Sequence, residues 1–295
     1  MPSNETLAPG GKEEAAALIV LNPAEAKRLI AKAVAVLPEV KKAMSNGIVM
    51  ISRGITDAFV LEELMGEKVE KKGEFSLGCI ASGELTVNQQ PSRTKPYIVR
   101  SGKVVDMASS EALRNLTPGD VFIRGANAVD RDGNAAVLVS SPNAGSIGEA
   151  LPSLLARGCS IIVPVGLEKL VPSVEAALPK CHLFRFKYAT GLPAALIPLP
   201  NAKVVTEVQA LQVLCGVKSI PVASGGIGGS EGASVLAVEG SAEGVESAFE
   251  LIKSIKGEPP VAAPEKLLPR AAQFGYRAQE FWSEWRKQMA QRPAH

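Results

Sequence analysis

The chain has 295 residues, which at about 100–200 residues per domain corresponds to one large domain or two ordinary ones. Its formal charge is only +2, from 32 basic and 30 acidic residues, so no basic excess marks a protein that binds nucleic acid or a membrane surface. Hydrophobic residues make up 46% of the chain and aromatic residues only 4%, a balance typical of the aliphatic interior of parallel sheets and their covering helices.

The amino terminus predicts neither a leader nor an anchor. Its first 20 residues lack a basic stretch followed by a long apolar core, which is the pattern of a signal peptide. The apolar run Ala15–Leu21 is too short to cross a bilayer. We therefore expect a cytoplasmic protein without membrane contact, with residues 1–14 disordered.

Cysteine and histidine are too sparse to suggest a metal site. The chain contains four widely spaced cysteines and two histidines: Cys79, Cys159, Cys181, Cys215, His182 and His295. Structural zinc needs closely spaced ligands, and a catalytic triad could draw only on His182. We predict neither a metal nor a cofactor.

The first two thirds of the chain alternate strands with helices. Apolar periodicity predicts, in order, a helix that begins at Asn22-Pro23 and is divided near Pro38, a strand at 48–51, a helix to about Leu64, a strand near 75–80, a β-hairpin at 97–107, a helix at 109–115, strands at 121–123 and 135–140, a helix to about Arg157, and a strand at 160–165. This alternation favours a doubly wound α/β domain with a largely parallel sheet.

From about residue 190 the pattern changes to a small α+β plait. It predicts a strand at 203–205, a helix at 206–214, an extended segment at 218–224, a glycine-rich link at 225–232, a strand at 234–238 and a helix at 242–255. A Gly/Pro-rich linker at 257–264 then leads to a C-terminal helix at 267–289. Its aromatic residues are expected to pack on the body of the protein or across a homo-oligomer interface: Phe274, Phe281, Trp282 and Trp285.

These elements predict four segments. They are residues 1–14, disordered; 15–190, a Rossmann-like α/β domain; 191–257, a small ferredoxin-like α+β domain; and 258–295, a linker and C-terminal helix.

Two loops, each between a predicted strand and a predicted helix, are the first candidates for ligand binding. The loops are residues 52–57 and 143–148, and the proposed anion ligands in them are Arg53, Gly54, Thr56, Gly145 and Ser146. A helix N-terminus offers unpaired backbone N–H groups and the positive end of the helix dipole, which bind anions. If both loops follow strands of one parallel sheet, they open at the same edge, where α/β sheets hold their ligands. The alternative is that Thr56 or Asp57 only caps its helix.

A polar loop follows the predicted strand 121–123. Asn127 is a candidate ligand there, and Asp130 and Asp132 are candidate catalytic carboxylates that hold hydroxyls or transfer a proton. The alternative is an ordinary turn, since Asp132-Gly133 and Asn134 are common turn residues.

Three segments resemble a known superfamily. They are GDVFIRGANAVDRDGN (119–134), SSPNAGSIGEALPSLLARGCSIIVPVG (140–166) and MISRGITDAF (50–59). They are similar to the sheet of the superfamily that holds ribose-5-phosphate isomerase type A, glucosamine-6-phosphate deaminase, methylthioribose-1-phosphate isomerase and the coenzyme A transferases. The resemblance extends over about 45–257. It implies a G-A-D-type loop after a strand, a glycine-rich loop, and an early strand–loop–helix unit that grips phosphate.

This resemblance implies binding, and isomerisation, of a small anionic metabolite such as a sugar phosphate. The chain departs from the isomerase pattern at Asn127-Ala128, where an acidic pair is expected, and asparagine cannot act as a base. One alternative is a coenzyme A or acyl transferase with Glu84 as its nucleophile. Another is a non-catalytic small-molecule-binding or assembly protein. The glycine-rich run at 225–232 is either a flap over the site or a plain hairpin link.

Overall fold

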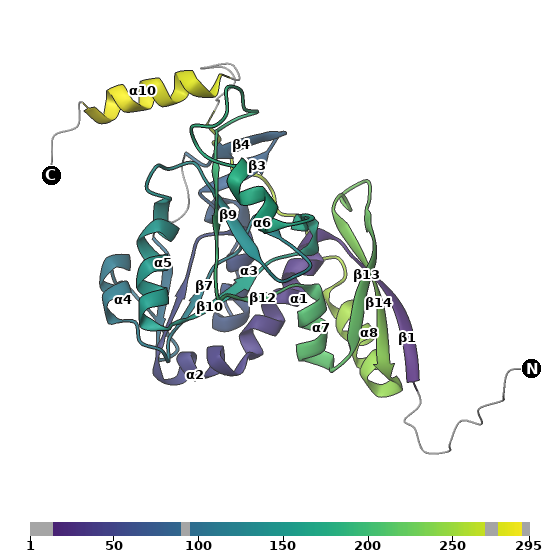
Figure 1. Cartoon of the computed structure of the whole chain (residues 1–295). Helices are drawn as coiled ribbons and strands as arrows, with labels where there is room; N and C mark the ends of the chain where they lie inside the picture. The colour runs from purple at the N-terminus through teal and green to yellow at the C-terminus, as the bar shows by residue number, and fades with distance from the viewer. Residues whose placement is uncertain (1–13, 90–94, 269–276, 291–295) are drawn as a thin grey trace, which may run out of the picture.

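The computed structural model describes residues 14–89, 95–268 and 277–290. Its largest sheet, in the described part of the chain, has six strands in the order β12-β10-β7-β2-β5-β6 (Figure 1). Four of these strands are parallel: β2 (Ile48–Ile51), β7 (Val121–Ile123), β10 (Ser160–Pro164) and β12 (Lys203–Val205). A hairpin of β5 (Tyr97–Arg100) and β6 (Lys103–Val105) adds two antiparallel strands. The predicted α/β class is therefore confirmed, with a mixed sheet.

Helices cover both faces of this sheet. One face packs against α1 (Pro23–Val36), α2 (Pro38–Asn46), α3 (Ile55–Met65) and α7 (Glu207–Cys215). The other packs against α4 (Ser109–Asn115) and α5 (Gly145–Arg157). Val49 and Ile51 point into the first core and Ile48 and Met50 into the second, which explains why β2 is apolar at every position.

A second, three-stranded antiparallel sheet lies beside the first (Figure 1). Its order is β1 (Glu14–Leu21), β14 (Ala233–Ser241) and β13 (Lys218–Gly225), and α8 (Ala242–Ile255) packs on it. The prediction that strand 203–205 belongs to this unit was wrong, because Val204 pairs in parallel with Val163 of the large sheet. The third strand of this sheet is instead β1. An apolar run as short as β1 does not distinguish a strand from a helix, so its role could not be predicted from the sequence.

The strand at 135–140 also lies outside the parallel sheet. It forms β9 (Ala135–Val139), which pairs antiparallel with β11 (Ala195–Pro198) and with β8 (Ala128–Val129). The prediction that the strands before both candidate loops share one parallel sheet was therefore wrong. In the parallel sheet β10 pairs directly with β7, and β9 pairs instead with β11 and β8, partners that are not apparent from its apolar sequence.

Short sequence signals, namely a capping residue, a proline and a glycine, mark the ends of three helices in the structure. Asn22 caps α1, its side chain accepting the Ala24 and Glu25 N–H groups at 2.9 Å, and the Glu25 carboxylate completes a capping box. The helix divides at Pro38, as predicted. Gly66 ends α3 with a φ of 71°, a left-handed conformation that glycine adopts without steric cost.

A separate hairpin precedes the candidate loop of β7. It consists of β3 (Gly78–Ala81) and β4 (Glu84–Val87), after a 3-10 turn, η1 (Lys72–Phe75). Short helical turns follow β10: η2 (Leu167–Lys169), α6 (Val174–Ala177) and η3 (Leu178–Lys180).

The C-terminal helix, α10 (Ala278–Ala290), is shorter than predicted. Leu267 instead pairs with Asn88 in an isolated bridge. Trp282 is buried, donates its indole N–H to the Leu183 carbonyl at 2.9 Å and packs on Phe184. Phe274, the side chains of Phe281 and Trp285, and residues 1–13 of the expected disordered segment lie outside the described residues.

Among the helices of the described part, none has the length and apolar character needed to cross a lipid bilayer.

Candidate functional site

A cavity of about 450 Å³ lies where the carboxyl ends of β2, β7 and β10 meet. Loops that leave these strands, and the loop after β9, form its floor. The structure brings all six sequence-predicted ligand residues to this cavity: Arg53, Gly54, Thr56, Asn127, Gly145 and Ser146. The two candidate loops therefore converge, even though β9 is not a strand of the parallel sheet.

Two helix N-termini face the cavity without a side-chain cap. Gly54 is the N-cap residue of α3 and Ala144 that of α5, and neither helix has a capping hydrogen bond from a side chain. Neither Thr56 nor Asp57 caps α3, which was the alternative interpretation of that loop. The first backbone N–H groups of both helices are thus left for another acceptor.

Arg124 is a site residue that sequence reasoning missed. Its Nη1 donates to Ser52 Oγ at 2.7 Å and to Ser146 Oγ at 3.2 Å, which ties the loop after β7 to both candidate loops. Its Nε is buried and has no hydrogen-bond partner. Burial lowers the pKa of this guanidinium, with Asp57 opposing the shift and Arg53 adding to it. The sequence signal that could have identified Arg124 is its position. It directly follows β7, just as the candidate ligand Arg53 closely follows β2.

A second charged group comes from the loop after β10. Glu168 Oε1 accepts from Lys27 Nζ at 2.6 Å and lies 3.9 Å from Lys169 Nζ, whereas Glu168 Oε2 is buried without a partner. Burial lowers the pKa of Lys169, Glu168 opposes this, and Lys27 lowers the pKa further. All three side chains line the cavity, and no sequence motif marks any of them.

Two buried carboxyl groups support the floor. Asp57 accepts the Gly125 N–H at 2.8 Å, and burial raises its pKa to about 6. Glu207 accepts the Leu167 N–H at 3.0 Å, and burial, reinforced by Glu168, raises its pKa to about 7. Glu207 lies behind the cavity rather than on its surface.

The cavity therefore has an excess of positive charge. Its charged lining residues are four basic and two acidic ones: Lys27, Arg53, Arg124, Lys169, Asp57 and Glu168. Together with two open helix N-termini, this set is suited to an anion.

The structure places Asp130 and Asp132 outside the lining of this cavity. Asp130 is buried, and its carboxylate accepts N–H groups from Asp132 at 3.1 Å, Asn134 at 2.9 Å and Val174 at 2.9 Å. Asp132 is exposed. This geometry matches the turn alternative, and the catalytic role stays a prediction. Glu84, the candidate of the transferase alternative, also lies outside the lining.

The glycine-rich run forms the loop of the β13–β14 hairpin. A Cβ on Gly226 would stand 1.9 Å from the Ser230 carbonyl oxygen, so this turn requires glycine. At the base of the loop, a Cβ on Gly232 would lie 3.2 Å from Glu168 Cβ, whereas Ile227 in the loop is 87% exposed. The run is thus a hairpin link whose last residue lies close to the cavity, and movement over the site stays a prediction.

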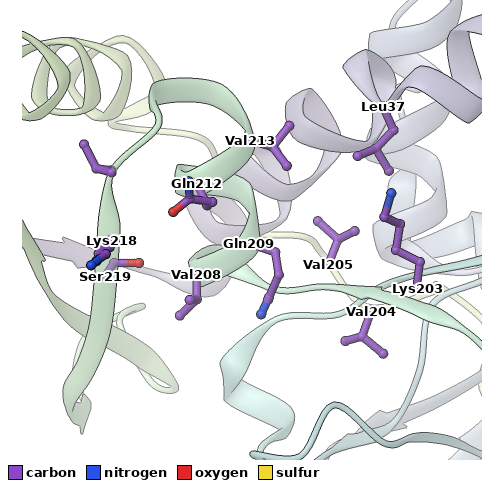
Figure 2. Close-up of a pocket in the computed structure, with 11 residues that line it drawn as sticks. Leu37, Lys203, Val204, Val205, Val208, Gln209, Gln212, Val213, Lys218 and Ser219 are labelled. Carbon is purple, nitrogen blue, oxygen red and sulfur yellow. The ribbon is translucent and has the colours of Figure 1, made fainter. Parts of the chain in front are cut away.

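A second hollow, of about 380 Å³, is an apolar groove between α7, β12 and β13, as Figure 2 shows. Val204, Val205, Val208 and Val213 dominate its wall. The Gln209 amide oxygen there already accepts from Thr206 in the capping box of α7. The first turn of α7 lines the groove, but Thr206 caps this helix. The charged lining residues are Lys203, which pairs with Glu39, and Lys218, so the cavity at the strand ends, with two uncapped helix N-termini, is the better candidate.

A scan against protein-family models and searches of curated proteins and solved structures each found no match. The superfamily resemblance thus stays a prediction.

Proposed function

We propose that the cavity at the strand ends binds a small phosphorylated metabolite, with a sugar phosphate as the leading candidate. The observation that carries the proposal is Arg124. Its Nε is buried at the cavity without a partner, beside two uncapped helix N-termini. Burying an unpaired guanidinium N–H is costly, and a phosphate oxygen would satisfy it.

The lining residues suggest a division of roles. Arg53 and Arg124 hold the phosphate, and the backbone N–H groups after Gly54 and Ala144 complete its cradle. Glu168 Oε2, buried without a donor, accepts a hydroxyl of the ligand.

The superfamily relationship and a doubly wound architecture are part of the same proposal. Helices on both faces of the large sheet, and a cavity at the carboxyl ends of its parallel strands, support it. Isomerisation would be the reaction that this relationship implies. Its proton acceptor would come from the carboxylates on the cavity surface, Asp57 and Glu168, rather than from Asp130.

One observation favours a second candidate, a binding protein without catalysis. The Asp130 carboxylate is engaged by backbone N–H groups, and Asn127 stands where the isomerase pattern expects an acid. Ligand binding without turnover would favour this candidate.

The test is calorimetric titration with inorganic phosphate, ribose 5-phosphate and glucose 6-phosphate. Arg124→Met should weaken phosphate binding by about 1.5–3 kcal/mol, the value of a hydrogen bond to a charged group. The matched control is Arg131→Met, whose side chain is 85% exposed and outside the cavity. Because Arg124 also holds Ser52, Arg53→Met serves as a second variant. The proposal fails if no phosphate compound binds, or if both cavity variants bind as the wild type does.

A further inference from the structure

We infer that the ligand of this cavity carries a hydrocarbon group beside its anionic group, and that the β3–β4 hairpin receives it. The inference rests on the proposed function, because the phosphate anchors the ligand at the basic residues of the same cavity. It narrows the substrate class from phosphorylated metabolites in general, sugar phosphates included, to those that also carry an alkyl, acyl or aryl group.

The hairpin presents large apolar side chains to the cavity. Ile80 of β3 stands directly opposite Leu85 of β4, so the two share one face of the hairpin, and both line the cavity. Ile80 is 67% exposed and Leu77, just before β3, is 40% exposed. Leu138 of β9 adds to the same wall. Burial of these two exposed and two half-buried aliphatic side chains under a ligand would lower the free energy of the complex.

The same wall offers little to a hydroxylated ligand. The part of the hairpin that lines the cavity, residues 76–80 and 85–87, carries no charged side chain. Its two hydroxyl groups already donate to main-chain carbonyls, Ser76 to Gly78 at 2.7 Å and Thr86 to Leu268 at 3.2 Å. The two hydroxyl hydrogens are thus already used, and the wall keeps only their oxygens as acceptors, so sugar hydroxyls turned toward it would exchange most of their hydrogen bonds with water for apolar contact.

The wall is held in place from behind. Leu192 N–H donates to the Leu85 carbonyl at 2.7 Å, and Leu85 N–H donates to the Thr190 carbonyl at 3.1 Å. Between them, a Cβ on Gly191 would lie 2.2 Å from the Leu85 oxygen, an approach that only glycine allows. The apolar wall is thus a preformed part of a cavity that Arg53 and Arg124 also line.

The test compares inorganic, methyl, n-butyl and n-hexyl phosphate by calorimetric titration. Burial of methylene groups against the wall should tighten binding by about three- to fourfold per methylene until the wall is covered. Ile80→Ser should reduce the gain from methyl to hexyl phosphate by tenfold or more. It should leave the affinity for inorganic phosphate within twofold, because the Ile80 side chain is 67% exposed and has neither charge nor a hydrogen-bonding group to offer an anion.

The control is Val104→Ser, which changes an exposed aliphatic residue on β6, at the far edge of the large sheet. It should leave the chain-length series unchanged. If phosphate binds but butyl and hexyl phosphate bind no tighter than methyl phosphate, the inference is overturned and the proposed function stands. If no compound of the series binds, both are overturned. Equal chain-length gains in wild type and Ile80→Ser would also overturn the role of the hairpin.

Discussion

Asp57 on α3 accepts the backbone N–H of Gly125 at 2.8 Å, so that a buried carboxyl group fixes the loop that carries Arg124. The same hydrogen bond joins the ends of β2 and β7. Asp57 therefore has two effects on the cavity: it positions the cation beside it, and its negative charge weakens attraction for an anion when it is ionised.

Two substitutions of Asp57 distinguish the effect of its hydrogen bond from the effect of its charge. Asp57→Asn keeps an oxygen acceptor for Gly125 and removes the charge, so phosphate should bind several-fold tighter at pH 7.5, a gain on the order of 1 kcal/mol. Asp57→Ala leaves the Gly125 N–H without its acceptor and should cost about 1–3 kcal/mol of stability. Calorimetry and urea unfolding measure the two quantities. Weaker phosphate binding by Asp57→Asn would contradict the assigned charge effect.

Glu207 should make stability depend on pH. Its pKa is raised from 4.5 to about 7, so between these values the folded protein binds more protons than the unfolded chain. The free energy of unfolding should therefore fall as pH rises from about 4.5 to 7, by an amount on the order of 3 kcal/mol. Glu207→Gln retains an oxygen for the Leu167 N–H and should remove this fall.

Urea unfolding of wild type and Glu207→Gln at pH 5, 6, 7 and 8 tests this difference. Asp57, with its pKa raised to about 6, leaves a smaller fall below pH 6 in both proteins. Parallel pH profiles for the two proteins would show that Glu207 is not the group that titrates.

Much of the fold could be predicted because its signals are local. The Asn22 cap, the break at Pro38 and the stop at Gly66 each depend on residues adjacent in sequence, and the structure has all three. Sheet membership could not be predicted in the same way. Strand 203–205 and the run Ala15–Leu21 are apolar in either sheet, and their partners are distant in sequence.

The residues of the candidate site likewise fall into two groups, those that sequence motifs predict and those that only the fold brings together. Arg53 and Ser146 stand in recognisable strand–loop–helix units, so their loops were found. Lys27 on α1 and Glu168 on η2 belong to no sequence motif, and they meet at the cavity as an ion pair between residues that are 141 positions apart. Asp130 is a carboxylate that follows a strand, as a catalytic residue would, but it accepts backbone N–H groups of its own loop.

Asp130 should matter for stability rather than for ligand binding. Asp130→Ala leaves the Val174 and Asn134 N–H groups without their acceptor and should destabilise the protein by about 3 kcal/mol. Asp130→Asn retains one acceptor oxygen and should cost less. Both variants should bind phosphate with unchanged affinity. A tenfold loss of affinity at unchanged stability would restore a direct role for this carboxylate.

Arg28 should be the most costly ion-pair residue to remove. Its side chain, 14% exposed, contacts Glu62, Glu63 and Glu258, and its guanidinium lies 4.8 Å from the centre of the Phe59 ring. Arg28→Met leaves three carboxylates without their shared partner and should cost about 3–5 kcal/mol in urea unfolding.

The matched control is the exposed pair of Lys253 and Glu250, in which Lys253→Met should change stability by less than about 0.5 kcal/mol. If Arg28→Met and Lys253→Met lowered the free energy of unfolding by similar amounts, the buried Arg28 ion pairs would contribute no more to stability than an exposed pair does.

The pairing of β1 with β14 has a consequence for synthesis of the chain. β1 ends at Leu21 and β14 begins at Ala233, so its partner follows roughly 200 residues later, an interval of roughly 10–40 s at about 5–20 residues per second. During that interval Leu18, Ile19 and Val20 form an aliphatic strand with no neighbour, which is open to pairing with other nascent chains. Fragments that end before β14 would carry this aliphatic segment without its partner strand and would therefore be prone to aggregate.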